Sequence, residues 1–91
     1  MIKKEFQITN KTGLHARPAA LLVKTTARFK SDVTITKDGL EVNGKSIMGV
    51  MTLAAERGSV IEITVDGPDE NGLIQALEEL ITGNFFEEPQ Q

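Results

Sequence analysis

Apolar and polar residues alternate along four short stretches of the chain. The stretches cover residues 2–9, 31–36, 40–42 and 60–65. Alternation with a period of two is typical of a β-strand with one face on a core and the other in solvent. Turn sequences that contain Gly39 and Gly67 follow the second and the fourth stretch. The pattern therefore predicts four strands, with a hairpin joining the second to the third.

Three further segments repeat apolar residues at helical spacing. The first covers residues 16–29. The side of this helix that faces a core consists of Ala19, Leu22, Val23, Thr26 and Phe29. Its other side carries a stripe of Arg17, Leu21, Lys24 and Arg28. Residues at this spacing share one face of a helix. We expect this stripe to be exposed, and the leucine among its cations hints at a docking surface.

The other two helical segments differ from the first. The second is shorter, and the third begins with two acidic residues. The second helix follows Ser46, a residue type favoured at a helix N-cap, and is expected to end near Arg57-Gly58. The third starts at Asp69-Glu70 and stops at Gly83. The resulting order, βαββαβα, predicts an α+β fold with a four-stranded antiparallel sheet and three helices on one of its faces.

The composition restricts the chemistry of the protein. With 91 residues, we expect one domain, residues 1–91, with one modest core. The absence of cysteine excludes disulfides and thiolate catalysis, and a zinc site would have to rest on carboxylates and one histidine. We expect no metal and no cofactor. The apolar runs are too short for a membrane span or a signal peptide, which predicts a cytoplasmic protein without membrane insertion.

Charge is distributed unevenly along the chain. Residues 1–45 contain nine Lys or Arg and four Asp or Glu, whereas residues 46–91 contain one Arg and nine acidic residues. The chain has no Trp or Tyr and a net charge of -3, so it lacks the broad basic surface and stacking platforms of a nucleic-acid-binding protein. A local basic patch for a phosphate or an acidic protein partner fits better.

The single histidine lies at the expected start of the first helix, in the sequence Gly13-Leu14-His15-Ala16-Arg17-Pro18. Backbone N–H groups of a first helical turn have no intrahelical acceptor, and with the positive helix end they bind anions. Ala16 and Arg17 would supply N–H groups here, and the guanidinium of Arg17 adds a planar cation. A neutral imidazole beside this site can accept a phosphoryl group. The alternative is that His15 is only a capping or surface residue.

A second motif, Lys45-Ser46-Ile47-Met48-Gly49-Val50-Met51-Thr52-Leu53, is apolar at nearly every position. A helix that is apolar all round cannot bury every side against one small core. Ile47 and Met51 share a face, with Met48 beside them, and flexible thioethers suit a surface that meets several partners. The alternative to a partner surface is that both methionines fill gaps in the core. Ser46 is either a plain N-cap or a site where phosphate regulates partner binding.

Together, the segments Gly13–Ala19 and Lys45–Leu53 at this separation resemble the HPr family, the histidine-containing phosphocarriers of the bacterial phosphoenolpyruvate-dependent phosphotransferase system. The resemblance spans essentially the whole chain and implies an open-faced β-sandwich. It implies that enzyme I phosphorylates Nδ1 of His15 and that the phosphoryl group passes on to a histidine of an enzyme IIA domain. By the same resemblance Arg17 stabilises the phosphate, and both partners read a surface made by Leu21, Lys24, Ile47, Met48 and Met51.

Ser46 matches the position that HPr kinase/phosphorylase modifies in many bacteria, where the modified protein transfers phosphate more slowly and acts as a corepressor with a transcriptional regulator. The C-terminal Thr82–Glu88 segment resembles HPr-like proteins of a nitrogen branch, whereas the Lys45–Gly49 block resembles the sugar branch. We expect a general phosphocarrier, monomeric and not itself an enzyme, with the branch left open.

Two other functions are compatible with the same residues. One is a non-catalytic regulatory module that binds a transcription factor or an enzyme through the Ser46 surface. The other is a small-ligand sensor on a similar α+β sheet, in which His15 is merely structural. Only a carrier would gain an acid-labile, base-stable phosphate from enzyme I.

Overall fold

In the computed structural model, which describes residues 1–86, four strands form one antiparallel sheet. The strands are β1 (Ile2–Gln7), β2 (Asp32–Lys37), β3 (Leu40–Asn43) and β4 (Val60–Asp66), arranged in the order β1-β4-β2-β3. Phe6 lies opposite Ile61, and Ile35 lies opposite both Ile63 and Val42. Apolar residues therefore share one face of the sheet, as the alternating pattern predicts.

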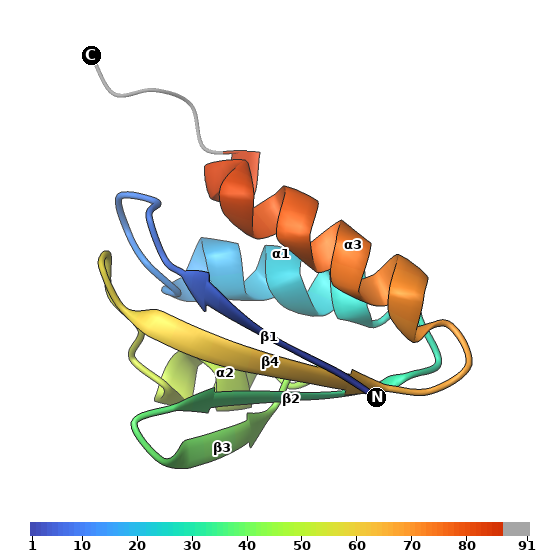
Figure 1. Ribbon diagram of the computed structural model, residues 1–91. Coiled ribbons are helices and arrows are strands. Elements are labelled where there is room, and N and C mark those ends of the chain that lie inside the picture. Colours follow the sequence, from blue (N-terminus) through green and yellow to red (C-terminus); the bar gives the residue numbers. More distant parts are fainter. Residues whose placement is uncertain (87–91) are drawn as a thin grey trace.

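Three α-helices complete the predicted βαββαβα order. They are α1 (Ala16–Thr26), α2 (Ile47–Thr52) and α3 (Glu70–Thr82). Helices α1 and α3 lie side by side over one face of the sheet and run in opposite directions, so that α3 ends near the start of α1 (Figure 1). Helix α2 packs against α1 and β3. Side chains buried between these layers form one continuous core.

The first two helices end earlier than expected. Helix α1 ends at Thr26 rather than near residue 29, because N–H groups of Arg28 and Phe29 bond carbonyls only three residues back. Helix α2 ends at Thr52 rather than near Arg57. Ala54 has a φ of 50°, which turns the chain so that its two neighbours, Leu53 and Ala55, are both buried. Core packing thus overrides the helical pattern at the end of α2.

A short helical turn that the pattern did not predict, η1 (Asn84–Phe86), follows α3. All three of its residues have φ values near +55°, a left-handed conformation that non-glycine residues rarely adopt. The turn buries Phe85 and leaves Phe86 exposed. Of the predicted C-terminal Thr82–Glu88 segment, residues 87 and 88 lie outside the described residues.

Candidate functional site

His15 occupies the N-cap position of α1, with an extended backbone (φ -80°, ψ -171°). Its carbonyl oxygen accepts a 2.9 Å hydrogen bond from the N–H of Ala19, the first bond of the helix. Its side chain is exposed and makes no capping hydrogen bond. The imidazole is therefore not used to close the helix, in contrast to the capping alternative raised by the sequence.

The loop before His15 is held against the chain that leaves α2. Gly13 has a φ of 65°, and a Cβ atom there would overlap the carbonyl oxygen of Ala55. That same oxygen accepts a 2.8 Å hydrogen bond from the N–H of Leu14, whose side chain is buried. Glycine is the residue that satisfies both the backbone conformation and the close approach. The chain that follows α2 is thereby joined to the first motif directly before His15.

The first turn of α1 is open to an anion. Within residues 1–86, the N–H groups of Ala16 and Arg17 have no hydrogen-bond acceptor, and the next residue, Pro18, has no N–H. No acidic residue occupies this turn. The Arg17 side chain is exposed and forms no ion pair within the described residues. Both donors and the cation are thus available beside His15, as expected for phosphate binding.

Ser46 is the N-cap of α2, as the sequence predicts. Its Oγ accepts a 3.0 Å hydrogen bond from the N–H of Gly49. The residue is half-buried. Just before it, the Nζ of Lys45 donates to the carbonyl oxygen of Phe29 (2.8 Å), and the buried hydroxyl of Thr26 donates to the carbonyl oxygen of Gly44 (2.9 Å). The last residue of α1 and the chain just after it therefore hold the two residues that precede Ser46.

An apolar surface lies on α2, next to α1. Ile47, Met48 and Met51 are 44%, 76% and 39% exposed, respectively. These side chains therefore do not fill the core, which excludes the alternative that both methionines are core residues. Lys24 is exposed on α1, but the expectation for Leu21 was too strong: it is only partly exposed and packs against the core. Leu21 lies close enough to the neighbouring core side chains to lose part of its solvent contact.

Sequence reasoning missed the contacts that hold the His15 loop. Asn10 is buried, and its Nδ2 donates to the carbonyl oxygen of Gly13 (2.9 Å), while its Oδ1 has no partner in the described part of the chain. On the other side of the loop, the hydroxyl of Thr9 donates to Oδ1 of Asn84 (2.6 Å). The Asn-x-x-Gly spacing is a turn signal that points to the first contact. No local signal points to the second.

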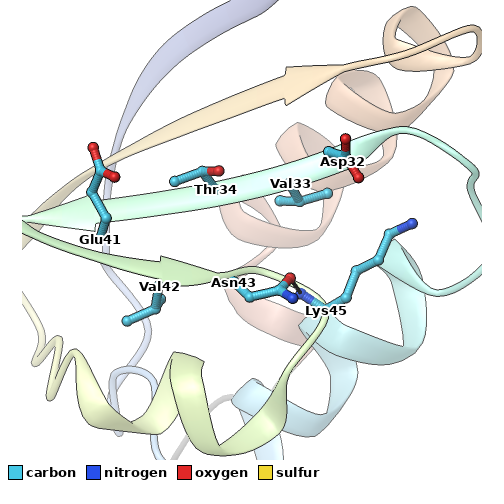
Figure 2. A pocket seen from close by; sticks show the side chains of 7 residues that line it. All are labelled: Asp32, Val33, Thr34, Glu41, Val42, Asn43 and Lys45. Atoms are coloured by element: carbon cyan, nitrogen blue, oxygen red, sulfur yellow. Dashed lines mark hydrogen bonds between the residues drawn. The ribbon is translucent and has the colours of Figure 1, made fainter.

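A polar pocket of about 480 Å³ lies away from His15, along the β2–β3 hairpin. Figure 2 shows Glu41 at one end, Asp32 and Lys45 at the other, and the hydrogen bond from the Lys45 N–H to Oδ1 of Asn43. It contains none of the predicted site residues. No group of three acidic or histidine side chains within residues 1–86 is placed to hold a metal ion, and none of the helices there is long and apolar enough to cross a membrane.

The fold and the exposed histidine at a helix start define an α+β protein of the open-faced sandwich class. Residues 2–83 match the family model described as the PTS HPr component phosphorylation site. The phosphocarrier protein HPr of Xylella fastidiosa (strain Temecula1) is 51% identical over 88 residues, which cover 97% of this chain and 99% of that protein. The chain belongs to the HPr family of the phosphotransferase system.

Two further relatives are similar to the chain over most of their length. The crystal structure of HPr-C-His from Thermoanaerobacter tengcongensis has a TM-score of 0.94 and 47% identity, and the match covers 98% of this chain and 100% of that one. The HPr-like protein Crh of Halalkalibacterium halodurans is 49% identical over 77 residues, 85% of this chain and 92% of that protein. Similarity of this extent identifies the chain as a phosphocarrier of the phosphotransferase relay, acting with phosphotransfer partners.

Proposed function

We propose that Nδ1 of His15 is the atom that carries the phosphoryl group. Phosphorylated enzyme I is the donor, and a histidine of an enzyme IIA domain is the acceptor. In each step the bond from phosphorus to the donor breaks as a bond to the acceptor nitrogen forms, so the protein is a covalent intermediate and not an enzyme. The observation that carries the proposal is the exposed imidazole at a helix N-terminus whose first N–H groups are open.

The first turn of α1 supports the phosphorylated state in this proposal. Transfer of a phosphoryl group depends mainly on alignment and on balancing charge. The N–H groups of Ala16 and Arg17 and the positive helix end would hold the phosphate oxygens, while the guanidinium of Arg17 offsets their charge. No metal and no cofactor is needed for these steps. A docked partner completes the alignment.

The docking surface consists of Leu21, Lys24, Ile47, Met48 and Met51. The support for it is that α2, which exposes apolar side chains, packs against α1, on which Lys24 is exposed. Met48 and Met51 can adapt to several partner shapes. Partner affinity is expected to be modest because a carrier must leave each partner quickly. We infer a monomeric cytoplasmic protein in which residues 1–91 form one domain, without nucleic-acid binding or membrane insertion.

Substitution of the most exposed methionine tests the docking surface. We expect Met48→Asp to weaken binding to both enzyme I and enzyme IIA while the far-UV circular dichroism spectrum stays unchanged, because the side chain contributes little to the core. Val60→Asp provides a control, since Val60 is similarly apolar and exposed but lies on β4. Equal binding by the parent and Met48→Asp would remove α2 from the docking surface.

Ser46 is proposed as a regulatory phosphorylation site, with HPr kinase/phosphorylase as the modifying enzyme and a transcriptional regulator as a further partner. The similarity to the HPr-like protein Crh supports keeping a second function, a corepressor module that acts through the Ser46 surface. The Ser46 hydroxyl already caps α2, so a kinase must replace a hydroxyl cap by a phosphate at the same helix end. The added charge would stand beside the apolar docking residues.

The direct test is incubation with enzyme I and radiolabelled phosphoenolpyruvate. The expected product is an acid-labile, base-stable phosphate on the parent chain and none on His15→Ala. Delivery to a sugar-branch IIA domain or to a nitrogen-branch IIA protein then decides between the sugar-transport carrier and the nitrogen-branch regulatory carrier. A chain that accepts no label but binds a regulator when Ser46 is phosphorylated would be the corepressor module instead.

A further inference from the structure

Among the described residues, those at the C-terminal end have the most unusual backbone. Asn84, Phe85 and Phe86 have φ values of 54°, 55° and 56°. A bulky residue such as Phe85 adopts this conformation only when its surroundings compel it. Phe85 is 1% exposed, so burial of its ring is what compels the turn. An outlier of this kind is a reason to ask what the turn holds in place.

The turn lies beside the loop that carries His15. Helices α1 and α3 run in opposite directions, so η1 lies at the end of the molecule where the β1–α1 loop projects (Figure 1). The hydroxyl of Thr9, at the start of that loop, donates a 2.6 Å hydrogen bond to Oδ1 of Asn84. Since Phe85 is fixed in the core, Asn84 presents this oxygen from an anchored backbone.

The opposite side of the loop is held by the chain after α2. The N–H of Ile8 donates to the carbonyl oxygen of Ser59 (2.8 Å), and the N–H of Leu14 donates to that of Ala55 (2.8 Å). Contacts from residues 55–59 therefore hold both ends of the loop from one side. The Thr9–Asn84 bond holds it from the other side.

We propose that Asn84 is a positioning residue for phosphoryl transfer, which latches the loop from Thr9 to His15 onto the anchored C-terminal turn. This inference rests on the proposed role of His15. Asn84 does not contact the phosphate; it acts by limiting the movement of the loop from which His15 and the open N–H groups emerge. Small displacements of a reacting group are costly in rate, so a loosened loop transfers phosphate more slowly. Because the bond is exposed and single, the expected effect is modest, at most about tenfold.

The substitution Asn84→Gly separates positioning from stability. Glycine removes the acceptor of the Thr9 hydroxyl and accepts the left-handed backbone without strain, so the thermal midpoint should change little. Asp38→Gly is a matched control, because Asp38 is also a polar residue with a positive φ (51°), located in the β2–β3 turn. Asn84→Asp keeps an acceptor oxygen and should restore the parental behaviour.

Two readouts decide the proposal. Asn84→Gly should lower kcat/KM for phosphorylation by enzyme I about threefold to tenfold and accelerate amide hydrogen exchange at Gly13 and Leu14. Asp38→Gly should change neither, and Thr9→Val should add nothing to Asn84→Gly. Parental kinetics and exchange in Asn84→Gly would overturn the latch. If the parent accepts no phosphate, the proposed function of His15 fails, and the exchange measurement alone still tests the latch.

Discussion

Helices α1 and α3 begin in opposite ways. At the start of α3, the Asp69 carboxylate accepts hydrogen bonds from the N–H of Lys30 (2.9 Å) and from the N–H and hydroxyl of Ser31 (3.0 and 2.5 Å). Glu70 adds a second carboxylate in the first turn. At the start of α1, the first turn has no acidic residue and the His15 side chain caps nothing.

The difference shows how one structural device serves two purposes. The Asp69 side chain makes no capping hydrogen bond either, but its carboxylate and that of Glu70 place negative charge at the positive end of α3, and Asp69 also ties α3 to the chain before β2. At the positive end of α1, the N–H groups of Ala16 and Arg17 have no acceptor within residues 1–86 and are open to an external anion. Stability is thus concentrated at one helix start, and binding capacity at the other. Substitutions at the two ends should consequently have opposite effects.

The largest expected effect is the loss of all phosphate uptake in His15→Ala. The variant should unfold within about 0.5 kcal/mol of the parent, because an exposed side chain without partners contributes little to the folded state. Phosphorylation by enzyme I and thermal unfolding, measured on the same sample, check both parts. A large drop in the unfolding midpoint would mean that His15 is structural. The start of α1 would then contribute to stability, as the start of α3 does.

Asp69→Ala should produce the reverse result. It removes the acceptor of three hydrogen bonds between α3 and the chain before β2, so the unfolding midpoint should fall clearly. At a temperature where the variant is folded, phosphorylation of His15 should proceed at the parental rate. Slower transfer by fully folded Asp69→Ala would show that the two helix starts are coupled.

Acid titration sharpens the same contrast. Hydrogen bonds from the Ser31 hydroxyl and the Lys30 N–H lower the pKa of Asp69, and those from the N-terminal amino group and the Gly67 N–H lower the pKa of Glu70. A carboxyl whose pKa is lower in the folded state stabilises that state above its unfolded pKa and loses this contribution as the pH falls through the folded pKa. The temperature of the thermal unfolding midpoint should therefore decrease as the pH is lowered past about 4. Asp69→Ala should show a flatter decline.

Most of the fold follows from local patterns in the sequence. The alternation through Ile61, Ile63 and Val65 places β4 correctly, and Gly83 ends α3 where a helix stop is expected. The early end of α2 could not be predicted in this way. It depends on burial of Leu53 and Ala55 and on a carbonyl oxygen offered to the distant Leu14, and these are tertiary contacts.

The candidate site likewise has features that the sequence predicts and features that it does not. The position of His15 at a helix start and the role of Ser46 as an N-cap follow from residue types and short spacings. The partial burial of Leu21 does not, because the helical stripe says which residues share a face but not what packs beside them. The Thr9–Asn84 bond joins residues 75 apart in the sequence, and no periodicity reports such a contact.

A smaller effect is expected from Arg17→Ala, which removes a cation from the open helix start without removing the nucleophile. Transfer should slow by about tenfold, since the charge on the transferring phosphate loses one stabilising group while the N–H groups remain. The fold should be unaffected because Arg17 has no ion pair within residues 1–86. Lys3→Ala, which removes an exposed cation from β1, is the control for general charge loss. Parental rates to both partners would exclude Arg17 from phosphate stabilisation.

The smallest effect on phosphate transfer is expected at the start of α2, at Ser46. Ser46→Ala should lose only the cap on α2, about 1 kcal/mol of unfolding free energy, and transfer phosphate normally.

Ser46→Asp should keep the fold, because a carboxylate can also accept the Gly49 N–H and interacts favourably with the helix end. The cost should fall on association, since a negative charge beside Ile47 and Met48 repels an acidic partner surface and must be desolvated on docking. We therefore expect a raised KM with enzyme I that added salt partly relieves. Identical kinetics for Ser46→Asp, Ser46→Ala and the parent would place position 46 outside the docking surface.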